Sequence, residues 1–481
     1  MLLVQNGISC EYEMNVFMRL FFDAKSNTYV YTNVDTNGGR IDAYCEIIYD
    51  DSVYFGEYIC DYTAGSDVKE NSRRYSVACT RAFLDAAQKI HRISLPWGAM
   101  CGVRPAKTVT RLIDTGMNYD EAEKYISEVY GVSDEKCYLA AKVAENESEI
   151  LKSIAPDSVS IYIGIPFCPS RCLYCSFVST DIGVTGKYIN DFVSLLLKEI
   201  DKTAEIIKRL GLHIENIYIG GGTPTTLDEI QLERLLARIN SAFDLSRLNE
   251  FTLEAGRPDT ITREKLLTAK KYGIDRISIN PQTTKDETLK NIGRKHTKDM
   301  FLNAFAVARE VGFNVINTDL IAGLPGENAD DFRKSIDYLV SLSPENITVH
   351  SMCIKRAASL RFTDNSLTEA ACMNEMLGYA QSTLCKNGYT PYYMYRQKNI
   401  SGNLENVGYA KPGARSFYNV NIMEEAQTII ALGGGGTTKI VTKNGIERIF
   451  NYKDPLEYIK NFDEILARKE QTAEILAGER R

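Results

Sequence analysis

The sequence lacks the features that would assign it to a membrane, secreted or nucleic-acid-binding class. Its 481 residues contain no run of about 18 apolar residues, the length that a membrane-spanning helix requires. The first sixteen residues have neither the basic region nor the continuous apolar stretch of a signal peptide. With 56 Lys and Arg against 63 Asp and Glu, the net charge of −7 offers no general attraction for nucleic acid or an anionic membrane. We therefore expect a cytoplasmic protein with no integral membrane segment and no nucleic-acid partner.

Cysteine occurs twelve times, but not as the disulfide framework of a short secreted domain, so we expect reduced thiols. Most of the cysteines are scattered among apolar neighbours, where a free thiol acts as a small buried hydrophobe. These are Cys10, Cys45, Cys60, Cys79, Cys101, Cys137, Cys353, Cys372 and Cys385. The remaining three, Cys168, Cys172 and Cys175, lie close together and require another explanation.

The N-terminal part of the chain predicts an α+β extension over residues 1–155. Short segments of alternating polarity, such as residues 16–22 and 52–58, lie between Asn, Gly and Asp turns and indicate a small sheet. Helical patterns follow at about 74–93, 119–130 and 134–153. The segment Pro-Asp-Ser at 156–158 then has the composition of a linker.

A regular alternation of apolar runs and amphipathic stretches begins after this linker. The apolar runs lie at 158–167, 214–219, 251–254, 276–280, 315–321 and 347–352. Helical candidates lie at 186–210, 227–243, 262–272, 299–311 and 329–342, with Gly211, Gly273 and Gly312 at expected helix ends. Six such units predict a parallel sheet, either a partial (β/α)6 barrel or a doubly wound sheet. We assign residues 156–355 to this domain and residues 356–481 to a small C-terminal α+β domain that covers the substrate.

The three clustered cysteines form a C-x3-C-x2-C motif directly after the first apolar run. Structural zinc is the main alternative, but it needs a fourth ligand at short spacing, and the nearest downstream histidine is His213. Three thiolates suit a four-iron cluster that leaves one iron open for chemistry. The motif therefore favours an iron–sulfur site.

The later apolar runs end in unusual polar or glycine residues. The second continues into Gly-Gly-Gly-Thr-Pro at 220–224, the third ends at Glu254, the fourth is followed by Gln282, and the fifth contains Asp319. Each alone has an ordinary explanation, since glycines form turns and a carboxylate can cap the next helix. In a parallel barrel, however, the strand ends share the face on which active sites form. The recurrence favours one polar site beside the cysteines.

Several motifs together resemble the radical S-adenosylmethionine superfamily. They are residues 162–175, from a tyrosine through the three cysteines, residues 220–224, and Arg-Ile-Ser-Ile-Asn-Pro-Gln at 276–282. Residues 317–325, Asn-Thr-Asp-Leu-Ile-Ala-Gly-Leu-Pro, narrow the resemblance to the oxygen-independent coproporphyrinogen III oxidase family. The segments 395–399 and 403–409 and the extension 1–155 are similar to its long HemZ-type coproporphyrinogen dehydrogenases. The resemblance covers about 155–450, and the combination is far more specific than any single motif.

The resemblance implies a partial barrel that holds a [4Fe-4S] cluster on Cys168, Cys172 and Cys175 and binds S-adenosyl-L-methionine. Tyr162 matches the family tyrosine ahead of the cluster, the position to which the resemblance assigns a catalytic and cofactor-binding role. The other matching cofactor-binding positions are Tyr174, Gly221, Gly222, Thr223, Glu254, Gln282, Arg294 and Asp319. A carboxylate such as Asp319 can accept hydrogen bonds from ribose hydroxyls, and Arg294 can pair with a carboxylate through two hydrogen bonds.

The implied reaction belongs to haem biosynthesis: a 5′-deoxyadenosyl radical removes hydrogen from propionates of coproporphyrinogen III, which lose carbon dioxide and an electron to become vinyl groups. An electron donor such as flavodoxin or ferredoxin is implied as a partner. The substrate is an anionic tetrapyrrole. Residues 355–415 contain eight basic and four acidic residues and six tyrosines, a local charge of +4. This segment suits such a ligand, although an ordinary solvated basic face explains the same composition.

Two residues depart from the oxidase pattern. Phe177 stands where the oxidases carry a fourth cysteine, and Gly164 replaces a histidine two residues after Tyr162. A phenylalanine after the cluster also occurs in the haem-chaperone branch of the family, which binds and delivers haem through a C-terminal His-Asn-x-x-Tyr motif. No histidine follows His350 here. A haem-binding chaperone and a radical enzyme acting on another substrate remain the alternative hypotheses.

Overall fold

The computed structural model describes residues 1–23, 26–62, 68–92, 94–175, 179–353, 370–397 and 401–479. The chain folds into two compact units. One contains Met1–Glu145 and Tyr395–Glu405, and the other contains Asn146–Met394 and Asn406–Arg481. The C-terminal part of the chain contributes to both units. The three domains expected from the sequence, 1–155, 156–355 and 356–481, stay predictions.

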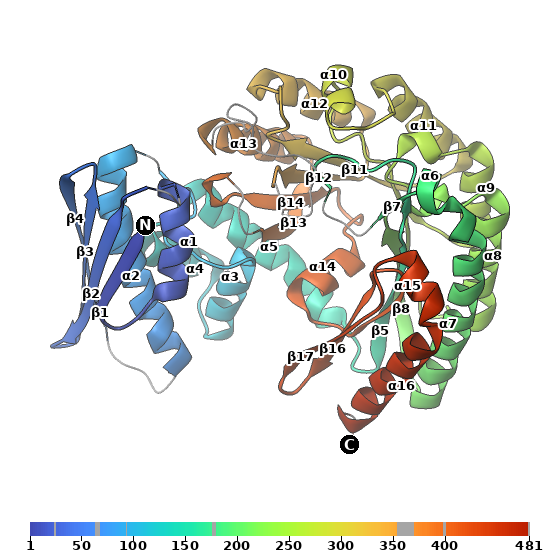
Figure 1. Ribbon diagram of the computed structural model, residues 1–481, viewed down its shortest axis with the longest axis horizontal. Coiled ribbons are helices and arrows are strands. Elements are labelled where there is room, and N and C mark those ends of the chain that lie inside the picture. Colours follow the sequence, from blue (N-terminus) through green and yellow to red (C-terminus); the bar gives the residue numbers. More distant parts are fainter. Residues whose placement is uncertain are drawn as a thin grey trace. The chain divides into compact units, whose positions relative to one another are not determined.

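The first unit is built on a sheet with the strand order β1-β2-β3-β4. Its strands are β1 (Leu2–Gly7), β2 (Tyr29–Asn37), β3 (Arg40–Tyr49) and β4 (Ser52–Asp61). Strand β1 runs parallel to β2, and the other pairs are antiparallel. Helices α1 (Glu11–Phe21) and α2 (Val68–His91) lie together against one face of this sheet (Figure 1).

Residues 16–22, expected as part of the sheet, lie in helix α1 and at its end, so this prediction was wrong. The buried residues of the helix are Met14, Phe17, Met18 and Phe21. Their spacing of three and four residues forms one apolar stripe on a helix, whereas a strand would bury every second residue. The aromatic and β-branched composition of the segment concealed this period.

Three further helices complete the N-terminal part. Helices α4 (Tyr119–Tyr130) and α5 (Asp134–Ser153) have the predicted bounds. Helix α4 begins with a capping box in which Asn118 and Glu121 bond each other's backbone N–H groups. Helix α3 (Pro105–Asp114) was not predicted, although Pro105 occupies its first turn, where proline is favoured.

The second unit contains one large sheet with the order β13-β14-β12-β11-β10-β9-β8-β5-β15-β16-β17. The predicted apolar runs form six parallel neighbours within it: β5 (Ser158–Ile165), β8 (His213–Gly221), β9 (Glu250–Glu254), β10 (Arg276–Ser278), β11 (Val315–Ala322) and β12 (Asn346–Ser351). These six follow one another in chain order, which is the order of a barrel and not of a doubly wound sheet. Among the described strands the sheet does not close, so the fold is the expected partial barrel.

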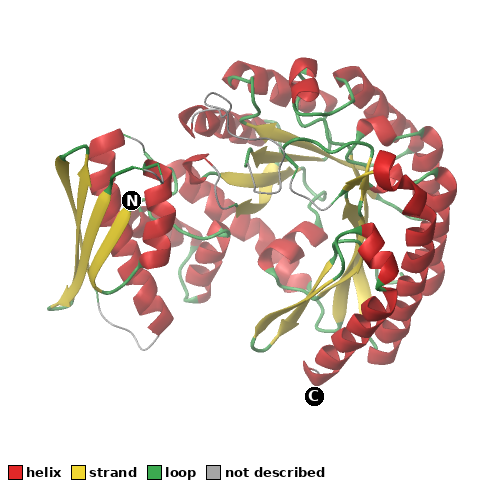
Figure 2. Cartoon of the chain, in the orientation of Figure 1, coloured by secondary structure: helices red, strands yellow, loops and turns green. Residues whose placement is uncertain are grey.

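Helices connect these strands and cover the outer face of the sheet (Figures 1 and 2). They are α7 (Ile189–Leu210), α8 (Glu229–Ala242), α9 (Arg263–Lys271), α10 (Asp286–Asn291), α11 (Lys298–Val311) and α12 (Ala329–Leu342). Gly211 and Gly312 end α7 and α11 in the left-handed conformation, as predicted. A short parallel pair, β6 (Phe167–Cys168) and β7 (Thr180–Asp181), and helix α6 (Ile182–Thr185) lie between β5 and α7.

The two faces of the parallel sheet differ sharply in polarity. The outer face consists mainly of buried Ile, Leu, Phe and Val side chains, such as Ile163, Ile219 and Leu253. Because paired residues point to the same side of a sheet, the strand registers place a polar set on the opposite, inner face. It contains Tyr162, Tyr218, Thr252, Glu254, Arg276, Ser278, Asn317, Asp319, Thr348 and His350. The interior of the partial barrel is therefore polar.

The C-terminal part of the chain extends the sheet at both ends. Its elements are α13 (Ala370–Lys386), β13 (Thr390–Arg396), β14 (Glu405–Ala410), α14 (Phe417–Glu424), β15 (Ile429–Gly433), β16 (Thr437–Thr442), β17 (Gly445–Phe450), α15 (Pro455–Lys460) and α16 (Phe462–Glu479). Strand β14 runs antiparallel to β12, and β15 runs parallel to β5. The chain thus returns to both edges of the parallel strands.

Residues 414–427 close the inner space near the beginnings of the strands. The Glu250 carboxylate, at the start of β9, accepts hydrogen bonds from Ser416 Oγ (2.9 Å) and the Phe417 N–H (2.8 Å). Arg276, at the start of β10, donates to the Ala414 carbonyl (3.0 Å). This part of the expected substrate-covering domain therefore forms a floor at the end opposite to the cysteines. No helix among the described residues is both long and apolar enough to cross a membrane.

Candidate active site

The cysteine loop begins where β5 ends. Cys168 and Cys172 are buried, and Cys175 is partly exposed. The Cys168 sulfur lies 3.4 Å from the hydroxyl of Thr223, which follows the glycine run. Burial raises the pKa of the Cys168 thiol, with Thr223 and Arg257 opposing that effect. The structure thus joins the predicted cysteine and glycine motifs directly.

The glycine run is required by the close approach of other groups. Gly221 has φ +115°, a conformation that side chains disfavour, and a Cβ there would lie 2.7 Å from the Ile165 nitrogen. A Cβ on Gly222 would lie 2.6 Å from the Phe167 carbonyl oxygen and 3.0 Å from the Cys168 sulfur. Bare backbone therefore passes directly beneath the cysteine loop.

Glu254, the last residue of β9, and Asp319, within β11, form a pair of carboxylates on the inner face. Burial, followed by the negative charge of Asp319, raises the pKa of Glu254 to about 8. The Gly221 N–H, which bonds this carboxyl, and Arg294 both oppose the rise. Asp319 accepts a hydrogen bond from Asn317 Nδ2 (2.7 Å) and lies 3.6 Å from His350 Nε2. Such a pair attracts cations and hydrogen-bond donors.

Three stacked tyrosines lie on the inner face below these carboxylates. The ring of Tyr218 stacks on that of Tyr418 with centroids 4.6 Å apart, and the ring of Tyr162 lies 6.3 Å from each. Burial, with Glu254 nearby, raises the pKa of all three hydroxyls. Of the three, only Tyr162 was predicted from the sequence. The strand alternation that pairs Tyr218 with it was the available signal.

Gln282 and Arg294 occupy strained or incompletely bonded positions at the same end of the sheet. Gln282 has φ +67°, an uncommon conformation outside glycine, and its backbone N–H bonds the Asp319 carbonyl (2.9 Å). Arg294 donates to the carbonyls of Gly256 (3.1 Å) and Asn280 (2.9 Å) and to the Tyr174 hydroxyl (3.2 Å). Contacts therefore join Thr223 to Cys168, Arg294 to Tyr174, and Gln282 to Asp319.

The two departures from the oxidase motif have different outcomes. Phe177 lies outside the described residues. Gly164 pairs with Gly433 of β15, and a Cβ on it would lie 2.5 Å from the Gly434 carbonyl oxygen. The C-terminal glycine loop therefore fills the space that a side chain at position 164 would need.

The basic segment is less available for ligands than the sequence suggested. Lys355, Arg356, Arg361 and Lys398 lie outside the described residues. Arg396 is buried and donates to the carbonyls of Met100 (2.8 Å) and Gly102 (2.7 Å). Arg396 therefore does not support the expectation that residues 355–415 bind an anionic ligand, because its guanidinium binds backbone carbonyls inside the N-terminal unit.

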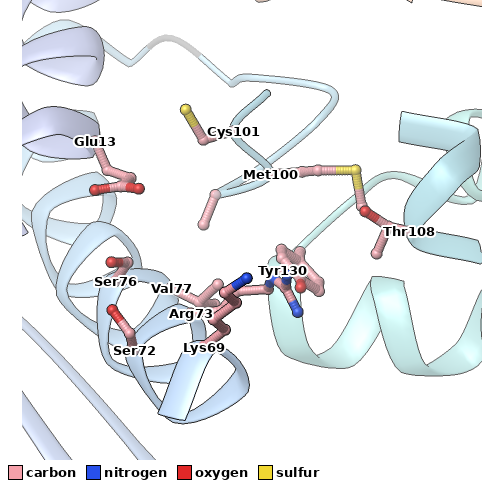
Figure 3. A pocket seen from close by; sticks show the side chains of 11 residues that line it. Glu13, Lys69, Ser72, Arg73, Ser76, Val77, Met100, Cys101, Thr108 and Tyr130 are labelled. Carbon is pink, nitrogen blue, oxygen red and sulfur yellow. The ribbon is translucent and has the colours of Figure 1, made fainter. Parts of the chain in front are cut away.

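The N-terminal unit has a separate pocket of about 250 Å³ (Figure 3). Its walls come from α1, α2, α3, α4 and the segment 99–101. Glu13 lies on one side, and Lys69 and Arg73 lie on another. All of its lining residues belong to the N-terminal unit, so it is distinct from the site on the sheet.

The residues at the cysteine end fit a cluster with a polar cofactor beside it. Among the described residues no group of three His, Cys, Asp or Glu is placed to hold a metal ion. A four-iron cluster takes one thiolate per iron, so its three cysteines need not converge on one point as the ligands of a zinc ion do. Buried polar atoms without a protein partner also lie here, namely Arg294 Nε, Asn280 Oδ1 and His296 Nδ1. Such atoms are expected where a polar ligand binds.

Comparisons with known proteins give a consistent result. The model of the radical SAM superfamily matches residues 162–339. The oxygen-independent coproporphyrinogen-III oxidase-like protein HemZ of Bacillus subtilis (strain 168) is 39% identical over 402 residues, which cover 82% of this chain and 80% of that protein. The heme chaperone HemW of the same organism is 38% identical over 197 residues, 41% of this chain and 51% of that protein.

Among solved structures, coproporphyrinogen III oxidase (HemN) from Escherichia coli has a TM-score of 0.53 at 21% sequence identity. The match covers 66% of this chain and 71% of that chain. This likeness concerns the fold, which is the partial barrel described above.

Proposed function

Since this chain belongs to the oxygen-independent coproporphyrinogen-III oxidase-like family of radical SAM proteins, we propose that it is an oxidoreductase of haem biosynthesis. The proposed reaction converts propionate side chains of coproporphyrinogen III into vinyl groups with loss of carbon dioxide, giving protoporphyrinogen IX. The family binds a [4Fe-4S] cluster and S-adenosylmethionine. When bound, these groups supply one-electron radical chemistry, while the protein supplies orientation and exclusion of water.

We assign the cluster to Cys168, Cys172 and Cys175. Gly221 and Gly222 allow the glycine run to lie directly against the end of β5 and the cysteine loop, because a side chain at either position would collide with them. Asp319 accepts hydrogen bonds from ribose hydroxyls.

Arg294 and Gln282 hold polar groups of the cofactor from the same end of the sheet. Tyr174 supports Arg294 through its hydroxyl. Tyr162 lies on the inner face close to Glu254, where its hydroxyl can bond the bound cofactor.

The observation that carries this proposal is the Glu254–Asp319 pair, on the face that also bears the cysteine loop. Burial and the neighbouring charge of Asp319 raise the pKa of Glu254 to about 8, so ionising this carboxyl beside Asp319 is unfavourable unless a cation lies next to it. The ammonium and sulfonium of S-adenosylmethionine are cations of this kind. A perturbed carboxyl at the open end of a parallel barrel is characteristic of a functional site.

Coproporphyrinogen III as substrate rests on the similarity to the HemZ and HemN proteins. The described part of residues 355–415 adds less support than expected, because Arg396 is buried. An electron donor such as flavodoxin or ferredoxin, a cytoplasmic location and the absence of a nucleic-acid partner stay predictions from the sequence.

A haem-binding chaperone is the second candidate, favoured by the similarity to HemW. A turnover assay and a parallel haem titration of the same protein separate the two functions. Anaerobically reconstituted protein is incubated with coproporphyrinogen III, S-adenosylmethionine and dithionite, and the porphyrins are oxidised and separated by chromatography. Formation of protoporphyrin supports the enzyme. Tight one-to-one haem binding without any decarboxylation supports the chaperone.

A further inference from the structure

Arg257 is a buried arginine that contacts the cysteine loop and was not among the predicted site residues. It follows the end of β9 and is only 3% exposed. Its Nη1 donates to the Ser170 carbonyl (3.1 Å) and lies 3.6 Å from the Cys172 sulfur. Its Nη2 donates to Ser170 Oγ (3.0 Å). One guanidinium therefore holds both the backbone of the loop and one of its thiols.

The remaining donors of Arg257 are fixed by a single carboxylate. Nε and Nη2 donate to the two oxygens of Asp259, each at 3.0 Å. The side chains are 4% and 11% exposed, so the pair is well shielded from solvent. A buried bidentate pair of this kind has little freedom to rotate. The thiol-facing edge of the guanidinium is thus held in one orientation by a negative charge behind it.

We propose that Arg257 is a positioning residue that anchors the cysteine loop and raises the reduction potential of the cluster. The negative charge of Asp259 makes this rise smaller. Reduction adds one electron, from an external reductant, to a cluster that already carries negative thiolates. A cation and a hydrogen bond at a ligating sulfur stabilise this added negative charge. The carboxylate of Asp259 opposes it. The inference depends on the cluster and not on the identity of the substrate.

Opposite charges give the proposal a distinctive prediction. Arg257→Gln removes the cation and is expected to shift the potential to a more negative value. Asp259→Asn keeps a hydrogen-bond acceptor for the guanidinium but removes the negative charge, so the potential is expected to become more positive. A purely structural role for the pair would not give shifts of opposite sign. Arg257→Lys retains the charge without the planar fork, and its potential should lie between those of wild type and Arg257→Gln.

The test is a redox titration of anaerobically reconstituted protein, followed by electron paramagnetic resonance, without porphyrinogen. The matched control is Arg263→Gln, because the side chain of Arg263 is half exposed and pairs with Glu310 on the surface. The control is expected to titrate like the wild type. Unchanged potentials in Arg257→Gln and Asp259→Asn, or shifts of the same sign, would overturn the electrostatic role.

Anchoring of the loop is measured separately. We expect the oxidised cluster of Arg257→Gln to lose iron to a chelator several-fold faster than that of wild type or Arg263→Gln. Equal rates in all three would overturn the anchoring role. If Arg257→Gln does not fold, the shift of the reduction potential in Asp259→Asn still tests the electrostatic role. The rate of iron loss from Arg257→Lys then tests the anchoring role. Failure of porphyrinogen turnover would leave these results unaffected, so it tests the proposed function alone.

Discussion

The raised pKa of Glu254 predicts that S-adenosylmethionine binding depends on pH. With a pKa of about 8, this carboxyl is protonated at neutral pH in the free protein. A cofactor that needs the ionised carboxylate as an acceptor must displace the proton. Because the folded pKa is raised, the proton is retained below about pH 8 and absent above it. Binding therefore releases a proton below this pH, and affinity rises as the pH increases.

The magnitude follows from the fraction of Glu254 that is ionised. That fraction is about one tenth at pH 7 and about nine tenths at pH 9 for a pKa of about 8. We therefore expect the dissociation constant to fall about tenfold across this range, which corresponds to ~1.4 kcal/mol. Above this range the affinity should level off. Removing the neighbouring charge with Asp319→Asn should lower the pKa of Glu254 and move the midpoint to lower pH.

Anaerobic calorimetry without reductant measures the affinity before any cleavage. The α-amino group of the cofactor also titrates near this pH. The dissociation constant of the wild type is therefore divided by that of Glu254→Gln at the same pH, because this variant lacks the titrating carboxyl at position 254. This variant should bind ~10- to 150-fold more weakly at pH 9, the loss of one charge-assisted hydrogen bond. Glu264→Gln, an exposed position in α9, is the control. A ratio between wild type and Glu254→Gln that stays constant from pH 6.5 to 9 would refute the reasoning.

Three further predictions concern other parts of the molecule. Cys172→Ala should lose iron and S-adenosylmethionine cleavage, as measured by iron content and 5′-deoxyadenosine release, whereas Cys385→Ala should retain both. Gly222→Ala should reduce the iron content, because the added Cβ would lie 3.0 Å from the Cys168 sulfur. Gly478→Ala is the control, since nothing lies within 4 Å of a Cβ at that position. Equal iron contents in the two variants would contradict the packing argument. Arg396→Met should lower the free energy of unfolding by about 1–3 kcal/mol, since buried carbonyls lose their donor. The KM for porphyrinogen should not change in Arg396→Met. A raised KM with unchanged stability would instead indicate that Arg396 binds the porphyrinogen.

The parallel sheet could be predicted from the sequence because each of its elements is bounded by a local signal. The left-handed glycines at 211 and 312 and the capping boxes of α8 and α12 lie within a few residues of the helices they end or begin. Helix α1 was missed because its aromatic residues satisfy the composition of a strand while their spacing is helical. Strand β15 was missed because its parallel pairing with β5 joins residues far apart in the chain.

The candidate site was only partly predictable for a similar reason. Cysteine spacing is local, Glu254 ends a recognisable strand, and Asp319 interrupts an apolar run. Tyr418 joins Tyr162 only through the fold of the C-terminal segment. Arg257 reaches Cys172 from the segment that follows β9, and no sequence spacing predicts that contact.

The polarity of the inner face has a signal in the sequence that the strand predictions did not use. Every second residue of β8, β9 and β11 is polar or aromatic near the site, and the strand registers place these residues on one face. A parallel strand buried on both faces is usually apolar throughout. The alternation in these strands is therefore sufficient, by itself, to indicate a polar interior.

The central claim is tested most directly by anaerobic turnover of coproporphyrinogen III with the reconstituted protein, S-adenosylmethionine and dithionite. The account predicts protoporphyrinogen IX, accompanied by 5′-deoxyadenosine, in wild type and in the Arg263→Gln control. Neither product should form in Cys172→Ala. Full cleavage of S-adenosylmethionine with no decarboxylated porphyrin, together with stoichiometric haem binding, would contradict the proposed enzyme.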